Sequence, residues 1–341
     1  MTKRAHRGVP ARNLNGPDEV VAAVPYLLGF TPTRSCVVIA LNGSGDVLFT
    51  CRVDLPPAEE VPAWSDCLGQ SLSRATGGLG RRALLVAFAD EDEEALVRSA
   101  TESVVTSIRG LGMEVLDRLW CREGRWSSLD CDDPECCPVG GRIITRRALM
   151  HARDCFPGHP CAESREALAR SLEHVPGDDA SAVQAELAAM ASEIRGTAID
   201  EPMRDIAIAH AVHQISSGPE APRDVALALA GLRDVRVRDT VLWDLLHGPR
   251  ESWAPMVVSL EHLVRLAPAG DVAPVATLLG VLEWQRGNGT KASMATERAL
   301  ADDPDYALAA LIDTCVVSGL PPGLWLRALQ SLTREECRRA A

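Results

Sequence analysis

The chain has 341 residues, of which 46% are hydrophobic and 24% are charged, and its formal net charge is −12. This length predicts two globular domains, and no apolar run approaches the roughly 18 residues of a membrane span or forms a signal peptide behind the basic start of the chain. We therefore expect a cytoplasmic protein with no membrane partner, and the acidic balance argues against general nucleic-acid binding.

The first secondary-structure signal along the chain is a β-hairpin. Two runs of β-branched and apolar residues, 36–41 and 47–53, flank the turn-forming segment Asn-Gly-Ser-Gly at residues 42–45. Such runs around a glycine-containing turn are typical of two antiparallel strands.

Helices and strands then alternate. The pattern predicts a helix over residues 58–76, a buried strand over residues 81–90, an acidic-starting helix over residues 91–112 and two further strands within residues 113–130. Together with the hairpin, these elements predict an α/β domain over residues 14–145, with a mixed sheet of about five strands and its helices in the crossovers.

The second half is expected to be all-helical, over residues 146–335, because alanine and leucine dominate and strand signals stop. One part, residues 273–306, has small residues and a proline at the spacing of a tetratricopeptide repeat: Leu279, Gly280, Gly287, Ala292, Ala299 and Pro304. We expect degenerate related helix pairs near residues 222–247 and 252–268. The alternative is an ordinary helical hairpin in a bundle.

The most unusual segment is Ser-Ser-Leu-Asp-Cys-Asp-Asp-Pro-Glu-Cys-Cys-Pro at residues 127–138, which contains Cys131, Cys136 and Cys137. An intracellular protein of this size keeps its thiols reduced and needs no disulfide staples, so the cluster requires its own explanation. Three interpretations remain open: a metal site, a redox pair, and a compact turn with buried sulfur.

Zinc is the metal that cysteine ligands favour, and it needs four ligands in a tetrahedron. The spacing Cys-x4-Cys-Cys is unfavourable, because side chains of adjacent residues diverge. A fourth ligand is sought among nearby cysteines and histidines, namely Cys121, His151, Cys155, His159 and Cys161.

A disulfide from Cys131 to Cys136 or Cys137 is the redox alternative, and in the cytosol such a bond is expected to be switchable. The surrounding carboxylates raise thiol pKa and disfavour a catalytic thiolate. In the third interpretation the cysteines are small apolar groups in a turn shaped by Pro138, Gly140 and Gly141.

Other polar residues suggest weaker sites. Asp54 and Asp90 end predicted strands, where a metal-dependent enzyme acting on nucleotides or nucleic acid gathers carboxylates. His210 and His213 are three residues apart on a predicted helix and are expected to form an ordinary helix face. Phosphate-binding loops, dinucleotide fingerprints, serine elbows and His-Glu-x-x-His motifs are not found in the sequence.

Several segments resemble the mostly actinobacterial domain-of-unknown-function family 4192. They are spread over nearly the whole chain and comprise VPYLLGF with Pro32 and Ser35, RVDLP at 52–56, GRWSSLDCDDPECCPVGG at 124–141, SRE at 164–166 and ERALADDPDYALAALI at 297–312. Cys131, Cys136 and Cys137 match the cysteine motif of the family, whereas Cys121, Cys155 and Cys161 match nothing in it. The resemblance implies membership but no activity.

We therefore expect a non-enzymatic interaction or regulatory protein that binds a protein partner through its helical surface. One alternative is a redox- or zinc-responsive regulator that acts through the three cysteines. The other is the metal-dependent enzyme at Asp54 and Asp90.

Overall fold

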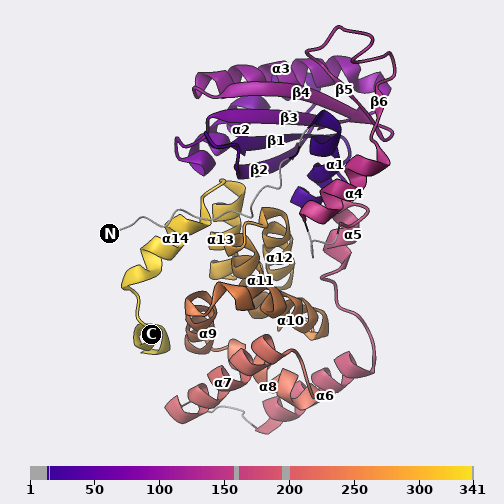
Figure 1. Ribbon diagram of the computed structural model, residues 1–341. Coiled ribbons are helices and arrows are strands. Elements are labelled where there is room, and N and C mark those ends of the chain that lie inside the picture. Colours follow the sequence, from indigo (N-terminus) through magenta and orange to yellow (C-terminus); the bar gives the residue numbers. More distant parts are fainter. Residues whose placement is uncertain (1–13, 15, 157–160, 194–199, 340–341) are drawn as a thin grey trace. The chain divides into compact units, whose positions relative to one another are not determined.

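The computed structural model describes residues 14, 16–156, 161–193 and 200–339 (Figure 1). The chain forms two compact units. The α/β unit comprises the residues up to Leu168 with Gly319–Pro321, and the helical unit comprises Ala169–Ser318 with the residues from Pro322 onward. No helix in the described ranges combines the length and apolar character that a bilayer span requires.

The α/β unit is built on a six-stranded mixed sheet with the order β2-β1-β3-β4-β5-β6. Only the β3–β4 pair is parallel. The strands are β1 (Ser35–Leu41), β2 (Val47–Asp54), β3 (Arg82–Phe88), β4 (Glu114–Arg122), β5 (Arg125–Ser128) and β6 (Arg142–Ile143). The expected mixed sheet is confirmed, with one strand more than the predicted five, because the two residues of β6 are too few to leave a periodic pattern.

Helices α2 (Val61–Thr76) and α3 (Glu94–Gly110) cover one face of this sheet. Alternate residues of β1 and β3 point to that face, and they form one apolar cluster with the buried side chains of both helices, including Leu72 and Val104. Every residue of β1 is buried, as the continuous apolar run of that strand indicates.

A helix pair completes this unit, and the sequence pattern predicted no helix for its first member. Helix α1 (Pro17–Leu28) packs against α4 (Arg146–Cys155) through small residues: Ala22 and Ala23 meet Ala148 and Ala152. Thr145 caps α4 and also donates to Asp18 of α1 at 3.1 Å. The chain after the predicted boundary at residue 145 therefore continues within the α/β unit.

The helical unit contains the rest of the helices, which confirms the expected helical second half. They are α6 (Asp178–Glu193), α7 (Glu201–Ser217), α8 (Pro222–Leu232), α9 (Val235–His247), α10 (Trp253–Leu266), α11 (Val272–Gln285), α12 (Gly289–Asp302), α13 (Ala307–Val317), α14 (Pro322–Ala328) and α15 (Arg334–Arg339); α5 (Arg165–Arg170) spans the boundary. Every residue of α11 is buried. This helix is therefore the centre of the unit, with α10, α12 and α13 around it.

The close approach of α11 and α12 depends on Gly280. A Cβ atom at this position would lie 3.1 Å from Cγ2 of Thr296 and 3.3 Å from the carbonyl oxygen of Ala292. Gly280→Val should therefore lower the free energy of unfolding by about 1–3 kcal/mol through overpacking. Urea unfolding monitored by tryptophan fluorescence measures this loss. Gly289→Ala is the matched control, since a Cβ there meets nothing within 4 Å; equal effects of both changes would contradict the packing argument.

Candidate functional site

The loop between β5 and β6 brings three cysteine side chains together. We call Cys131, Cys136 and Cys137 the thiol cluster: their sulfur atoms all lie within 4.8 Å of one another. Cys136 is exposed and the other two are half-buried, and all three are free thiols. The expected divergence of the adjacent pair is not observed, because the chain turns at residues 134–136 instead of running extended.

Backbone hydrogen bonds to Asp133 form this turn. The Asp133 carbonyl accepts from the amides of Cys136, at 3.1 Å, and Cys137, at 2.6 Å. The Asp133 carboxylate accepts from the amide of Glu135 at 2.9 Å. In addition, the Ser128 amide at the end of β5 donates to Sγ of Cys137 at 3.4 Å. The cluster is thus tied to the sheet through its third cysteine.

Two arginines hold the loop from the strand side. Arg142 of β6 donates to the carbonyl of Cys136 and, at 2.5 Å, to the carbonyl of Glu135. Arg125 of β5 donates to the carbonyl of Gly141 at 3.0 Å. Gly141 has φ +76°, and a Cβ there would lie 2.8 Å from the carbonyl oxygen of Trp126, so only glycine fits. The sequence identified the cysteines but not the two arginines. Each arginine side chain donates to a backbone carbonyl several residues away in the chain, and no local pattern indicates this.

The surroundings of the exposed Cys136 thiol favour its protonated form. The pKa of the Cys136 thiol is raised, first by its hydrogen bond with Cys131 and then by the negative charge that Cys131 and Cys137 would carry. Sequence reasoning attributed this direction to the carboxylates of the segment. One of these, Asp130, is neutralised by Arg118, whose Nε lies 3.0 Å from it. A cation that binds the cluster must therefore displace protons from it.

Removing the Arg142 clamp should weaken metal binding without removing a ligand. Arg142→Gln loses both guanidinium contacts to the loop carbonyls. Because groups that orient ligands commonly change metal affinity about 10–100-fold, we expect a zinc affinity lower by about tenfold or more. Competition with a chromophoric chelator measures it. Arg146→Gln, on the exposed first turn of α4, is the control, and an unchanged affinity in Arg142→Gln would contradict the clamp.

The cluster geometry fits a thiophilic ion. Zinc–sulfur bonds of about 2.3 Å place tetrahedral sulfur ligands about 3.8 Å apart, and the observed limit of 4.8 Å leaves this spacing within reach of small side-chain rotations. In the described residues, the thiol cluster is the one group of three or more cysteine, histidine or acidic side chains close enough to hold a metal. The residues present supply three ligands.

The other ligands considered from the sequence do not join the cluster. Cys121 is buried in β4, and burial raises its pKa to about 12. The Cys155 sulfur lies 3.6 Å from Nε2 of His151 within α4. The Cys161 sulfur lies 3.9 Å from the hydroxyl of Thr31. His159 lies outside the described residues.

The His151–Cys155 contact is not arranged as a catalytic relay. A nucleophilic cysteine and an orienting carboxylate must contact opposite nitrogens of the imidazole. Here the Glu19 carboxylate also contacts Nε2, at 3.7 Å. This pair therefore gives no support to thiol catalysis.

The carboxylates at the strand ends are solvent-facing. Asp54 is 74% exposed and forms an ion pair with Arg52 at 2.6 Å. Asp90 is also exposed.

On α7, the imidazole Nε2 of His213 lies 3.5 Å from Glu220, and its Nδ1 lies 3.4 Å from the hydroxyl of Ser217. Within the described part of the chain, neither these aspartates nor His210 and His213 belong to a potential metal-binding group.

Comparison with known proteins agrees with the resemblance seen in the motifs. No curated protein and no solved structure matches the chain. A family model described as "Domain of unknown function (DUF4192)" matches residues 17–323, which includes most of both units and the thiol cluster. The chain belongs to the DUF4192 family.

Proposed function

We propose that this protein is a non-enzymatic, cytoplasmic regulatory protein whose thiol cluster binds zinc or another thiophilic ion. The observation that carries this proposal is the convergence of three sulfur atoms within 4.8 Å in a loop clamped by Arg142 and Arg125. Thiolates select soft or borderline ions such as zinc and copper(I) over magnesium or calcium. Bound zinc would cross-link the loop and fix its turn.

Native mass spectrometry of the full chain, purified without reductant or chelator, tests this proposal. A mass excess of one zinc ion per chain supports it. Metal-free protein that takes up no zinc when the ion is added contradicts it. Thiol mapping of residues 121–161 in the same sample identifies any bond formed instead.

A switchable disulfide within the cluster is the competing function. The same proximity favours it, since two of the sulfurs need only rotate to reach bonding distance. A disulfide uses two of the three thiols, and the third thiol could attack that bond and exchange with it. The loss of two hydrogens in the mass spectrum, together with the absence of zinc, would replace the metal proposal by this one.

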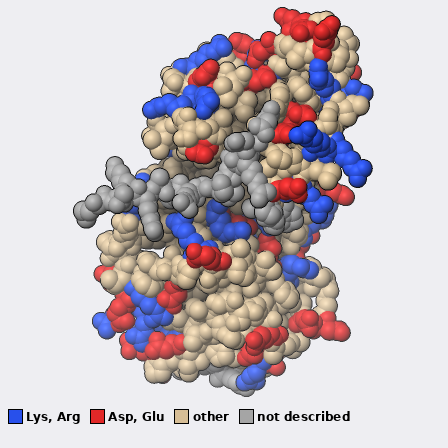
Figure 2. All heavy atoms as spheres, in the orientation of Figure 1, with Lys and Arg blue, Asp and Glu red and all other residues tan. Residues whose placement is uncertain are grey.

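We also propose that the helical unit binds a protein partner. The α11–α12 hairpin, with Gly280 at the crossing, is compatible with tetratricopeptide-like packing, and such helix pairs offer surfaces for partner helices. Figure 2 shows arginine and lysine side chains interspersed with acidic ones over the visible face. This mixture favours a protein partner over a nucleic-acid backbone, which requires concentrated positive charge.

A further inference from the structure

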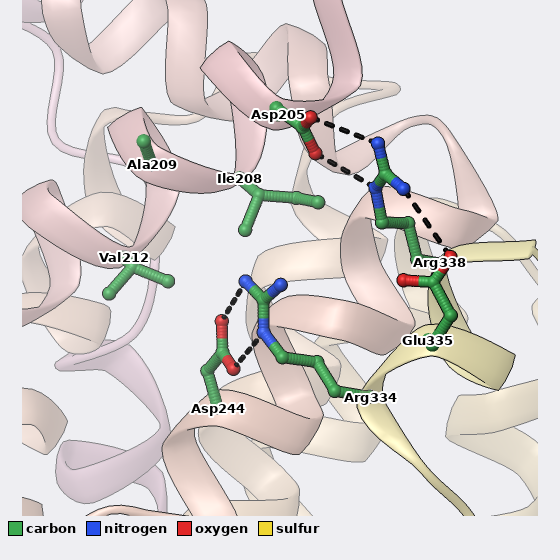
Figure 3. Close-up of a pocket in the computed structure, with 8 residues that line it drawn as sticks. All are labelled: Asp205, Ile208, Ala209, Val212, Asp244, Arg334, Glu335 and Arg338. Atoms are coloured by element: carbon green, nitrogen blue, oxygen red, sulfur yellow. Dashed lines mark hydrogen bonds and ion pairs between the residues drawn. The ribbon is translucent and has the colours of Figure 1, made fainter. Parts of the chain in front are cut away.

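The surface between α7 and α9 has the features of a helix-binding groove (Figure 3). We call it the α7–α9 groove: Asp205, Ile208, Ala209 and Val212 of α7 line it together with Asp244 of α9. The α7 residues are three, four and seven positions apart, so they share one helix face. Ile208 is buried, so the apolar strip that the groove offers consists of Ala209 and Val212, and it lies between two carboxylates.

The C-terminal helix α15 already lies against this groove. Arg334 donates to both carboxylate oxygens of Asp244, at 2.7 and 2.8 Å. Arg338 donates to both oxygens of Asp205, at 2.8 and 2.9 Å. Figure 3 shows the two guanidinium groups reaching from α15 towards these carboxylates. Bidentate pairs of this kind fix the relative positions of the two groups in addition to matching their charges.

The recognition pattern of α15 is short and specific. Arg334, Cys337 and Arg338 are at i, i+3 and i+4, which places them on one helix face. Cys337 is 4% exposed. A capping box between Thr333 and Glu336 starts the helix, since each accepts from the backbone amide of the other, at 3.2 and 2.7 Å. The pattern that fits the groove is thus Arg-x-x-apolar-Arg.

This helix does not fill the space available to it. An open pocket of about 560 Å³ is lined by the α7 residues, by Asp244 and by Arg334, Glu335 and Arg338 of α15. In each ion pair one partner is exposed and the other half-buried: Arg334 is 44% exposed and Asp244 22%, whereas Asp205 is 55% exposed and Arg338 17%. Because solvent weakens exposed pairs, a helix with one short buried side chain is held loosely. A longer helix would cover more of this pocket.

We propose that the α7–α9 groove is a docking site for a partner helix carrying the pattern Arg-x-x-apolar-Arg, and that α15 is its displaceable occupant. The inference rests on the proposed partner binding by the helical unit and specifies its location and chemistry. Charge complementarity sets the partner: two acidic groups on the groove require two cationic groups four residues apart. The burial of Cys337 requires an apolar residue before the second arginine.

A synthetic helix tests this proposal on the full chain. The probe is a fluorescent alanine- and glutamine-based peptide of about 16 residues, long enough to form helix in water, with one Arg-Gln-Ala-Leu-Arg segment. Fluorescence anisotropy should show saturable binding to the wild-type chain. Arg334→Ala/Arg338→Ala, which frees the groove, should bind about tenfold more tightly, because the peptide no longer competes with α15.

Two controls locate the binding. Asp205→Asn/Asp244→Asn should bind at least about tenfold more weakly than Arg334→Ala/Arg338→Ala, since the groove charges are removed. A peptide in which glutamate replaces both arginines should bind the charge-reversed variant Asp205→Arg/Asp244→Arg. Binding to this variant would show that it is folded. Amide exchange of residues 333–339 should quicken when the probe binds the wild-type chain.

Two outcomes would overturn the proposal. If Arg334→Ala/Arg338→Ala shows no saturable binding, the groove is not a helix-docking site. If the probe binds equally well to the variants with and without Asp205 and Asp244, it binds elsewhere on the chain. The second result excludes the groove as the binding site but does not contradict partner binding elsewhere on the helical unit.

Discussion

Replacing Cys131, Cys136 and Cys137 together by serine should reduce zinc binding from about one ion per chain to a negligible level. Serine hydroxyls remain protonated and are poor zinc ligands, whereas each thiolate forms a bond of about 2.3 Å. Since the loss of groups that merely orient a ligand costs about 10–100-fold in affinity, we expect the loss of all three ligands to exceed about 100-fold. Elemental analysis and chelator competition measure both quantities.

Cys67→Ser is the matched control for this variant. Cys67 is an exposed free thiol on α2, so its removal changes the thiol count without changing the cluster. Zinc affinity should also fall as pH falls, because protons compete for the thiolates and the pKa of Cys136 is raised. A triple variant that retains stoichiometric zinc would show that the ion binds elsewhere.

The sequence predicted the fold of the α/β unit where local signals were strong. The glycine-containing turn at residues 42–45 joins β1 and β2, and the apolar run ending at Phe88 is β3. Two elements were missed for different reasons. Helix α1 has an interior proline, Pro25, and its start signals, Asp18 and Glu19, stand in a short segment before the hairpin. Strand β6 exists only because β5 provides an edge for it.

The candidate site was predictable in composition but not in geometry. Three cysteines within seven positions identify the segment, yet spacing alone suggested that adjacent cysteines diverge. The turn at Asp133 and the clamp from Arg142 reverse that expectation. The clamp depends on a strand pairing that brings residues 125–126 beside 142–143, and side-chain periodicity carries no information about this pairing. The contact of α15 with the α7–α9 groove was missed because it joins segments about 130 residues apart.

A buried charge network in the helical unit involves Lys291, one of two lysines in a chain with 33 arginines. Its amino group lies 2.6 Å from Glu261 of α10 and 3.7 Å from Oε1 of Glu283. Glu283 is 1% exposed in the middle of the unit, and its other oxygen lies 2.9 Å from Arg286. A compact ammonium fits between two carboxylates where a planar guanidinium requires a fork-shaped site.

Lys291→Met should therefore be strongly destabilising. It leaves the buried Glu283 carboxylate with one of its two cationic neighbours, and breaking a buried pair in this way costs about 3 kcal/mol of unfolding free energy. Urea unfolding followed by tryptophan fluorescence, to which Trp284 on the same helix contributes, measures the loss. Arg223→Met is the control, since the Arg223–Glu186 pair is open to water at 3.6 Å and its removal should cost no more than about 0.5 kcal/mol.

The loss should grow with pH, and its direction separates a charge effect from a packing defect. Burial raises the pKa of Glu283 above its ordinary value of 4.5, so the folded state holds this proton more tightly than the unfolded chain does. The contribution of Glu283 to stability is then fully present below pH 4.5 and falls as pH rises through the raised pKa. Lys291 lowers that pKa, so its removal raises the pKa further and extends the fall to higher pH. The difference in unfolding free energy between wild type and Lys291→Met should thus be smaller at pH 5 than at pH 8. A pH-independent difference would assign the effect to the lost aliphatic contacts of the lysine side chain.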